Sequence, residues 1–204
     1  QSKLPQIVDG TATKLLAEDL DGATKINNYA FYYNSSLSLV ELPEGVEIIG
    51  SNAFRYANNI HTLILPVSLK SIATYAIQNM NNLKNIYSTA NNILWSVSSN
   101  NSSYTSANMR LGCEYLLKDG KKQYLYWKGN YNAEDIAELY VYYSDESEVI
   151  IPDNIDGYAV RKLGNNLFRD SIANNIEIPS TVGEIGDNCF RNCVNLRKIQ
   201  LPER

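Results

Sequence analysis

The chain has 204 residues and is 44% hydrophobic and 20% charged, so it is long enough for one or two compact domains and too apolar to stay disordered. Its 18 basic and 22 acidic residues give a formal net charge of −4, which creates no positive field to attract a nucleic acid. No run of about 18 apolar residues is present, so no membrane-spanning helix is predicted. With one His and three Cys, most metal and nucleophile chemistries lack their side chains.

Residues 1–22 precede the first repeat and are predicted to form an N-terminal cap, which together with the first repeat array makes up residues 1–87. The cap contains leucines around the acidic residues Glu18, Asp19 and Asp21. We expect these leucines to cover the first coil of the array.

A 23-residue period defines the array. Phe31, Phe54 and Ile77 are 23 residues apart, and Pro43 and Pro66 repeat the same step. Five units can be aligned along the chain, and each contains a small or apolar residue followed by a large apolar one: Ala30-Phe31, Ala53-Phe54, Ala76-Ile77, Leu167-Phe168 and Cys189-Phe190. This pair is read as one helical turn, and the alternating apolar residues before each proline predict a short strand.

One coil of this size cannot bury its own apolar face, so successive coils must stack. Each inward Phe or Leu covered in this way contributes roughly 1.5–3 kcal/mol. The predicted fold class is therefore an α/β solenoid, with short parallel strands and short helical turns in each coil and a β-rich insert between two arrays.

Two segments carry a family resemblance: LPEGVEIIGSNAFRYANNIHTLILP (Leu42–Pro66) and IPSTVGEIGDNCFRNCVNLRKIQLP (Ile178–Pro202). Both are similar to BspA-like leucine-rich repeats, and the resemblance covers Ala23–Tyr87 and Val149–Pro202. It implies a curved, right-handed solenoid of the kind found in surface-exposed proteins that bind hosts, other cells or matrix. Ile77 departs from the family pattern, because Phe is usual there.

Residues 88–110 interrupt the repeat pattern and are predicted to be a Ser/Asn-rich cap or linker. Residues 88–108 contain 7 Ser and 5 Asn, a composition typical of loops. Trp95 lies within an apolar group of four residues, which we expect to cover the open end of the first array, with the Ser/Asn tract after it exposed.

Residues 111–148 form a Tyr-rich β insert. Asp119-Gly120 separates two alternating segments, Glu114–Lys118 and Lys122–Trp127, and this arrangement predicts a hairpin. A further strand is expected at Glu138–Tyr143. The second array occupies residues 149–204, and because no C-terminal cap is visible we expect either a longer array or a partner chain against Pro202.

The sequence contains no Gly-rich phosphate loop, nucleophile elbow, H-E-x-x-H or C-x-x-C motif, so no catalytic residue, metal site or cofactor is predicted. His61 falls in a polar column expected to face solvent. Cys189 and Cys193 are four residues apart, which could suit a metal, but the alignment puts both in slots for small buried residues. The acidic groups around Asp19 and Glu146 lack the ligand spacing of a Ca²⁺ loop.

The candidate ligand-binding face is the outward side of the strands before the prolines. Side chains alternate along a strand, so the outward positions of successive coils form columns. The residues of this face are Leu39, Glu41, Thr62, Ile64, Asn85, Tyr87, Glu177, Lys198 and Gln200. An apolar strip of Leu39, Ile64 and Tyr87 would suit a protein ligand, although scattered apolar side chains are also normal on a surface. The Tyr-rich strands from Tyr115 to Tyr143 offer a second candidate, for stacking on a glycan or for packing within the insert.

The leading hypothesis is a non-enzymatic, extracellular or cell-surface module that binds a host, cell-surface or virion protein, with a glycan as a second candidate partner and nucleic acid excluded. A structural or receptor-binding component of a phage particle is the alternative, because LPQIVDGTATKLLAEDLDGATKIN also resembles leucine-rich repeat proteins of gut phages. An enzyme within the Tyr-rich insert is a third reading.

Overall fold

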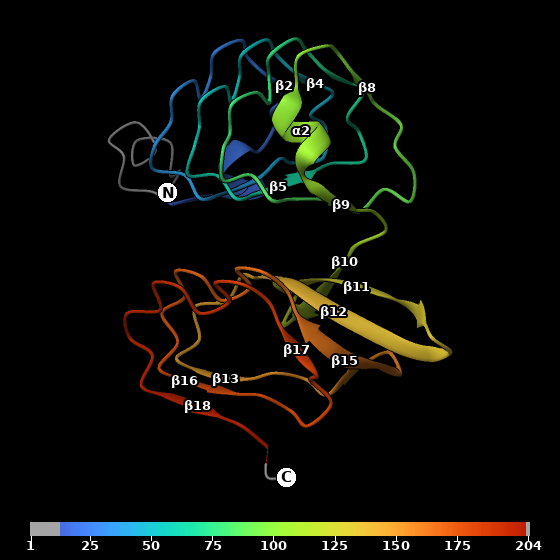
Figure 1. The fold of residues 1–204 in the computed structure, drawn as a ribbon, viewed down its shortest axis with the longest axis vertical. Coiled ribbons are helices and arrows are strands. Elements are labelled where there is room, and N and C mark those ends of the chain that lie inside the picture. Colours follow the sequence, from blue (N-terminus) through green and yellow to red (C-terminus); the bar gives the residue numbers. More distant parts are fainter. Residues whose placement is uncertain (1–12, 203–204) are drawn as a thin grey trace. The chain divides into compact units, whose positions relative to one another are not determined.

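The computed structural model describes residues 13–202, which fall into two compact units divided between residues 112 and 113 (Figure 1). Each unit has its own apolar core and is described separately. The predicted cap in residues 1–22 lies partly outside the described residues.

Unit 1 is a stack of coils in which each coil adds one strand to each of two parallel sheets (Figure 1). The first sheet has the order β1 (Lys14–Leu15), β3 (Leu39–Glu41), β5 (Thr62–Leu65), β7 (Asn85–Ser88) and β9 (Asn108–Arg110). The second has the order β2 (Lys25–Ile26), β4 (Ile48–Ile49), β6 (Ser71–Ile72) and β8 (Ser96–Val97).

The register of the first sheet follows the sequence period. Leu39 pairs with Thr62, which pairs with Asn85, so neighbouring strands are offset by one 23-residue step. The prediction of stacked coils with short parallel strands is therefore confirmed, and Pro43 and Pro66 lie just past the ends of β3 and β5.

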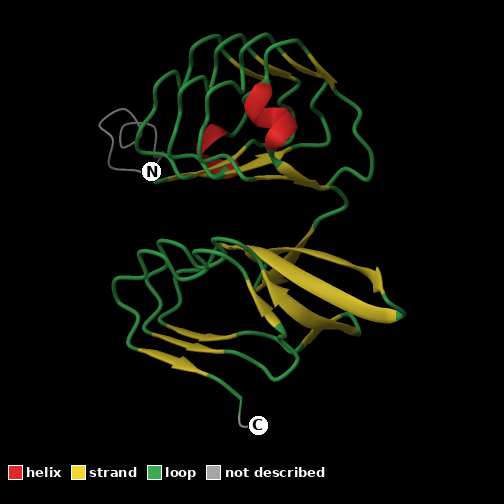
Figure 2. Ribbon diagram, viewed as in Figure 1, coloured by secondary structure: helices red, strands yellow, loops and turns green. Residues whose placement is uncertain are grey.

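The predicted helical turns are wrong. Figure 2 shows loops at these positions, and the helices of the described chain are a 3-10 helix, Ala17–Leu20, and α2, Ser102–Ser106. The hydrogen bonds of successive turn amides explain why these turns are not helical. Ala30 N–H donates to Asn27 O within the coil, whereas Phe31 N–H donates to Ala53 O of the next coil at 2.7 Å. An α-helix keeps its amide hydrogen bonds within one segment, so a turn that gives every second amide to its neighbour cannot be helical.

The core of unit 1 is one continuous cluster. Phe54 and Ile77 are fully buried in it, and Phe31 packs against it with its ring stacked on that of Phe54, 5.1 Å between centroids. The three residues of the 23-residue period thus share one interior, as the stacking argument requires.

Residues 88–110 form a further coil of unit 1 instead of a loop or linker. β8 pairs with β6 and β9 pairs with β7, and Trp95 is buried in the core. The segment therefore closes the stack by continuing both sheets. The sequence conceals this coil because it lacks the Phe and Pro landmarks of the repeat.

Asn101 ends the stack of turns in unit 1. Its Oδ1 accepts the Ile77 N–H at 2.7 Å, in place of the backbone carbonyl that a following coil would supply. Its Nδ2 donates to Ala73 O and Ser98 O, and Ser103 Oγ accepts the Met80 N–H. The Ser/Asn tract was expected to be exposed, but Asn101 and Ser103 are buried because they satisfy these amides.

Unit 2 begins with an antiparallel meander, β10 (Glu114–Lys118), β11 (Lys121–Tyr131) and β12 (Glu134–Tyr142). The hairpin predicted at Asp119-Gly120 is confirmed. The second hairpin turn, Asn132-Ala133, has positive φ at both residues and was not predicted.

The meander continues directly into the second array. β12 pairs in parallel with β15 (Tyr158–Leu163), which also pairs with β14 (Asn154–Ile155) and β17 (Glu184–Ile185). A second sheet consists of β13 (Glu148–Ile150), β16 (Asn175–Glu177) and β18 (Lys198–Gln200).

Aromatic rings join the meander to the coils of unit 2. Tyr142 lies 4.9 Å from Phe168 between ring centroids, and Phe168 is stacked on Phe190 at 5.7 Å. Tyr124 is fully buried beside them. The Tyr-rich insert therefore closes one end of this core, whereas the apolar side chains of the last described coil, such as Leu201 at 65% exposure, stay accessible.

Replacing Phe54 with Ala should lower the free energy of unfolding by about 3–5 kcal/mol, because the change leaves a cavity between two coils. Chemical denaturation followed by circular dichroism measures this loss. Tyr131→Ala, at an exposed position, is the control. A loss below about 1 kcal/mol for Phe54→Ala would contradict the shared core.

Asn101→Ala should cost about 1–3 kcal/mol, since it leaves the Ile77 N–H buried without an acceptor. Ser102→Ala, one position along on an exposed residue, should cost less than about 0.5 kcal/mol. Equal losses in the two variants, compared by thermal and chemical unfolding, would show that Asn101 does not cap the stack.

The Cys189 thiol should resist alkylation in the folded protein. Burial raises the pKa of this thiol to about 12, and the side chain is 3% exposed. At pH 8 the reactive thiolate is therefore scarce and shielded. Mass spectrometry after iodoacetamide treatment should find Cys189 unmodified until urea unfolds the chain; rapid modification of the native protein would refute the buried assignment.

Candidate functional site

The unit 1 residues of the predicted face pair in the expected register, but they are not exposed to solvent. Leu39, Thr62 and Asn85 form one column of the first sheet, and Glu41, Ile64 and Tyr87 form the next. All six side chains are buried, with at most 4% exposure.

The expected apolar strip of Leu39, Ile64 and Tyr87 is therefore not a solvent-exposed surface. These three residues lie outside the apolar core cluster of unit 1, whereas their inward neighbours Val40 and Leu63 belong to it. Side-chain alternation fixes which way a residue points, but it does not determine whether that face is accessible to solvent.

The second-array members of the predicted face are exposed. Glu177 pairs with Gln200 across β16 and β18, and Lys198 lies on the same strand as Gln200, with Nζ donating to Oε1 at 3.2 Å. This part of the face is polar and belongs to unit 2. The predicted nine residues consequently do not form one continuous exposed apolar site.

The single His was expected to face solvent, and this expectation is wrong. His61 is 5% exposed, and its Nδ1 lies 2.8 Å from Thr62 Oγ1. Cys189 is buried as expected, while Cys193 is half-buried and its Sγ donates to Phe168 O at 2.9 Å.

Within residues 13–202, no group of three or more His, Cys, Asp or Glu side chains is arranged to hold a metal ion. The same part of the chain has no helix with the length and apolarity needed to cross a membrane.

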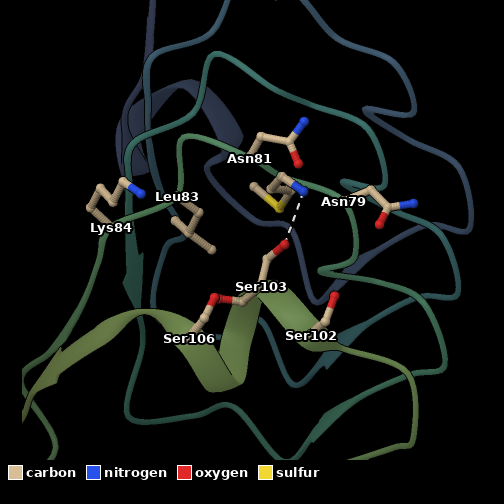
Figure 3. Close-up of a pocket in the computed structure, with 8 residues that line it drawn as sticks. Asn79, Asn81, Leu83, Lys84, Ser102, Ser103 and Ser106 are labelled. Carbon is tan, nitrogen blue, oxygen red and sulfur yellow. Dashed lines mark hydrogen bonds between the residues drawn. The ribbon is translucent and has the colours of Figure 1, made fainter.

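A pocket of about 350 Å³ lies beside α2 (Figure 3). Ser102, Ser103 and Ser106 come from the helix, and the opposite wall is formed by residues 79–84 of the preceding coil. Figure 3 shows the hydrogen bond from the Met80 amide to Ser103 across this wall. Lys84 supplies the one charged side chain of the lining, and the remaining polar side chains are amides and hydroxyls, so the pocket offers hydrogen bonds and a single positive charge.

The turns of unit 1 carry a group of aromatic side chains, some exposed and some half-buried, that the sequence reasoning missed. We call it the tyrosine surface, and its residues are Tyr29, Tyr32, Tyr33, Arg55, Tyr56 and Tyr75. The side chains of Tyr29, Tyr32 and Tyr33 are 58%, 38% and 60% exposed. Coil stacking places residues 23 apart side by side, which brings Tyr33 onto Tyr56 with ring centroids 4.5 Å apart.

Arg55 continues the row of rings. Its guanidinium carbon lies 4.9 Å from the Tyr56 ring centroid and 4.8 Å from that of Tyr75. Tyr32 packs edge-on against Tyr33 and Tyr56 at 4.6 and 5.9 Å. Desolvation raises the pKa of Tyr32 above its usual value.

Four of these tyrosines have a backbone conformation that is unfavourable for a bulky residue. Tyr29, Tyr33, Tyr56 and Tyr75 have φ between 58° and 62°. A non-glycine residue in this left-handed region costs about 1–3 kcal/mol, whereas Asn and Asp tolerate it best. Asn or Asp occupies the equivalent left-handed positions in other turns of the two units, namely Asn52, Asn79, Asn166, Asp170, Asn188 and Asn192.

The Tyr-rich insert, the second candidate site of the sequence analysis, has buried tyrosines where the tyrosine surface has exposed ones. Tyr124, Tyr126 and Tyr142 are buried within the core of unit 2. Burial raises the pKa of Tyr126 and of Tyr142 to about 12, which keeps both phenols neutral. These three side chains are therefore packing residues rather than a stacking surface.

Comparisons with solved structures find leucine-rich repeat proteins. A leucine rich cell surface protein from Faecalibacterium prausnitzii A2-165 is 26% identical, with 89% of this chain and 46% of that chain covered and a TM-score of 0.43. The T. pallidum leucine rich repeat protein is 20% identical, with 93% and 69% covered and a TM-score of 0.38. The pneumococcal vaccine antigen PcpA is 19% identical, with 95% and 49% covered and a TM-score of 0.35.

The chain spans about half the length of the first of these structures. No curated protein has a matching sequence. The family model described as BspA type leucine rich repeat region matches residues 20–116 and 135–204 in 6 copies. Because these residues make up most of the sequence and fold into stacked coils, the chain belongs to the BspA-type leucine-rich repeat family.

Proposed function

We propose that this chain is a non-enzymatic protein-binding module that serves adhesion in a surface-exposed or secreted bacterial protein. The observation that carries the proposal is the display of side chains by stacked coils. Hydrogen bonds between coils hold each turn in place, so residues 23 apart form fixed columns on the surface, as Tyr33 and Tyr56 do.

A surface of this kind favours binding because its side chains are already ordered, so little conformational entropy is lost when a partner binds. Association normally costs about 0.5–1.5 kcal/mol for each side chain that must be immobilised. Tyr32, Tyr33 and Tyr56 already pack against one another in the unbound chain. Tyr and Arg are also the residue types enriched where interfaces derive most of their binding energy.

Membership of the repeat family supports this function. The location at the cell surface is part of the proposal. The phage-particle component suggested by the N-terminal sequence stays a prediction, because no feature of the described residues favours it over the bacterial assignment.

Biolayer interferometry of the full chain against immobilised fibronectin, fibrinogen, laminin, collagen and mucin tests the proposal. We expect saturable binding to at least one of these proteins, with a Kd in the micromolar range or tighter. Immobilised serum albumin is the control for nonspecific adsorption of the folded chain. Failure of the folded chain to bind any of the five saturably would overturn the adhesion function.

A further inference from the structure

The tyrosines at left-handed turn positions are poor choices for stability. Asn or Asp occupies the matching positions in the other turns, and either suits this backbone better than Tyr. Tyr29 and Tyr33 are also more than half exposed, so burial recovers little of the conformational cost. Strained residues that stability does not explain are characteristic of functional sites.

The two units provide an internal comparison for Arg55. Arg169 follows Phe168 just as Arg55 follows Phe54, so both arginines occupy the same place in their turns. In unit 2 the next residue is Asp170, whose carboxylate lies 3.7 Å from Arg169 Nε. In unit 1 the next residue is Tyr56, which occupies the position of that acid.

No carboxylate among residues 13–202 forms an ion pair with Arg55. Its Nη1 donates to Asn52 Oδ1 and its Nη2 to the Tyr56 hydroxyl, at 3.2 and 3.3 Å. The three turns that carry the tyrosine surface, residues 27–35, 50–58 and 73–81, contain no Asp or Glu.

We propose that the tyrosine surface binds an acidic segment of a partner protein, with an Asp or Glu carboxylate on Arg55 and adjoining apolar side chains on the tyrosine rings. The inference rests on the proposed function and names the surface and the chemistry of its partner. A guanidinium presents paired donors to a carboxylate, and a charge-assisted bond of this kind is stronger than a neutral one.

The packing of the rings favours a protein segment over an acidic glycan. Sugar rings stack on open aromatic faces, but here Tyr56 is in contact with both Tyr33 and Arg55, and Arg55 also lies over Tyr75. The ring of Tyr56, at the centre of the row, is thus occupied by its neighbours. The exposed parts of Tyr29 and Tyr33 and the tyrosine hydroxyls remain for contact, and these suit the mixed polar and apolar surface of a polypeptide.

Selection of displayed random twelve-residue peptides on the full chain, followed by fluorescence anisotropy of the synthetic peptides, tests the proposal. We expect the selected peptides to be enriched in Asp or Glu beside apolar residues. Arg55→Gln should weaken their binding roughly tenfold or more, as should the double variant Tyr33→Asn with Tyr56→Asn. Tyr131→Asn, at an exposed tyrosine of unit 2, should change the Kd by less than twofold.

Thermal unfolding separates a binding role from a structural one. The double variant should melt at the same temperature as the native chain or a few degrees higher, because Asn suits the left-handed positions better. A melting temperature lowered by more than about 4 °C would assign the two tyrosines to stability and overturn the proposal.

Three binding outcomes would also overturn it. One is selection of peptides without acidic enrichment, and another is equal binding by the native chain and the Arg55→Gln variant. The third is Arg55-dependent binding of polygalacturonate without peptide binding, which would assign the surface to an acidic glycan. If a matrix protein binds the native chain and the tyrosine variants equally, the adhesion function stands and the tyrosine surface is not its site.

Discussion

The structure depends on hydrogen bonds that every second turn amide donates to the next coil. Phe31 N–H bonds to Ala53 O and Phe54 N–H to Ala76 O, while the intervening amides bond within their own coil. No coil can satisfy its backbone alone, so each needs a neighbour or a substitute for one. Asn101 is such a substitute, and its side-chain amide takes over the role of a missing coil. Packing of Phe54 between coils then gives the stack its apolar interior.

The same hydrogen-bond pattern creates the positions that we assign to binding. A turn that alternates its amides in this way requires left-handed residues four apart, as at Tyr29 and Tyr33. Unit 2 fills the equivalent sites with Asn and Asp, and unit 1 fills several with Tyr. A backbone rule of the scaffold therefore determines where a surface residue sits, and the choice of Tyr over Asn exchanges local stability for an exposed aromatic surface.

The sequence period predicts the pairing of Leu39 with Thr62 and the shared burial of Phe54 and Ile77, because a fixed repeat length leaves one register. It does not distinguish a helical turn from a stacked one, since both place an apolar pair at the same spacing. The coil that contains Trp95 is hidden by its lack of repeat landmarks. The burial of the predicted face in unit 1 could not be predicted, because side-chain alternation gives orientation and not exposure. The tyrosine surface left a readable signal, namely Tyr at positions where other turns carry Asn or Asp.

Hydrogen exchange of individual amides, followed by NMR, tests the interlocked coils most directly. If the turn amides of Phe31 and Phe54 are held by the next coil, they should exchange as slowly as the strand amides of β5 and only with unfolding of the whole unit. The Asn58 amide, which bonds to Tyr56 O within its own turn and not to the next coil, should exchange far faster. Exchange of the Phe31 and Phe54 amides at the rate of Asn58 would show that neighbouring coils do not hold one another, and would contradict the account.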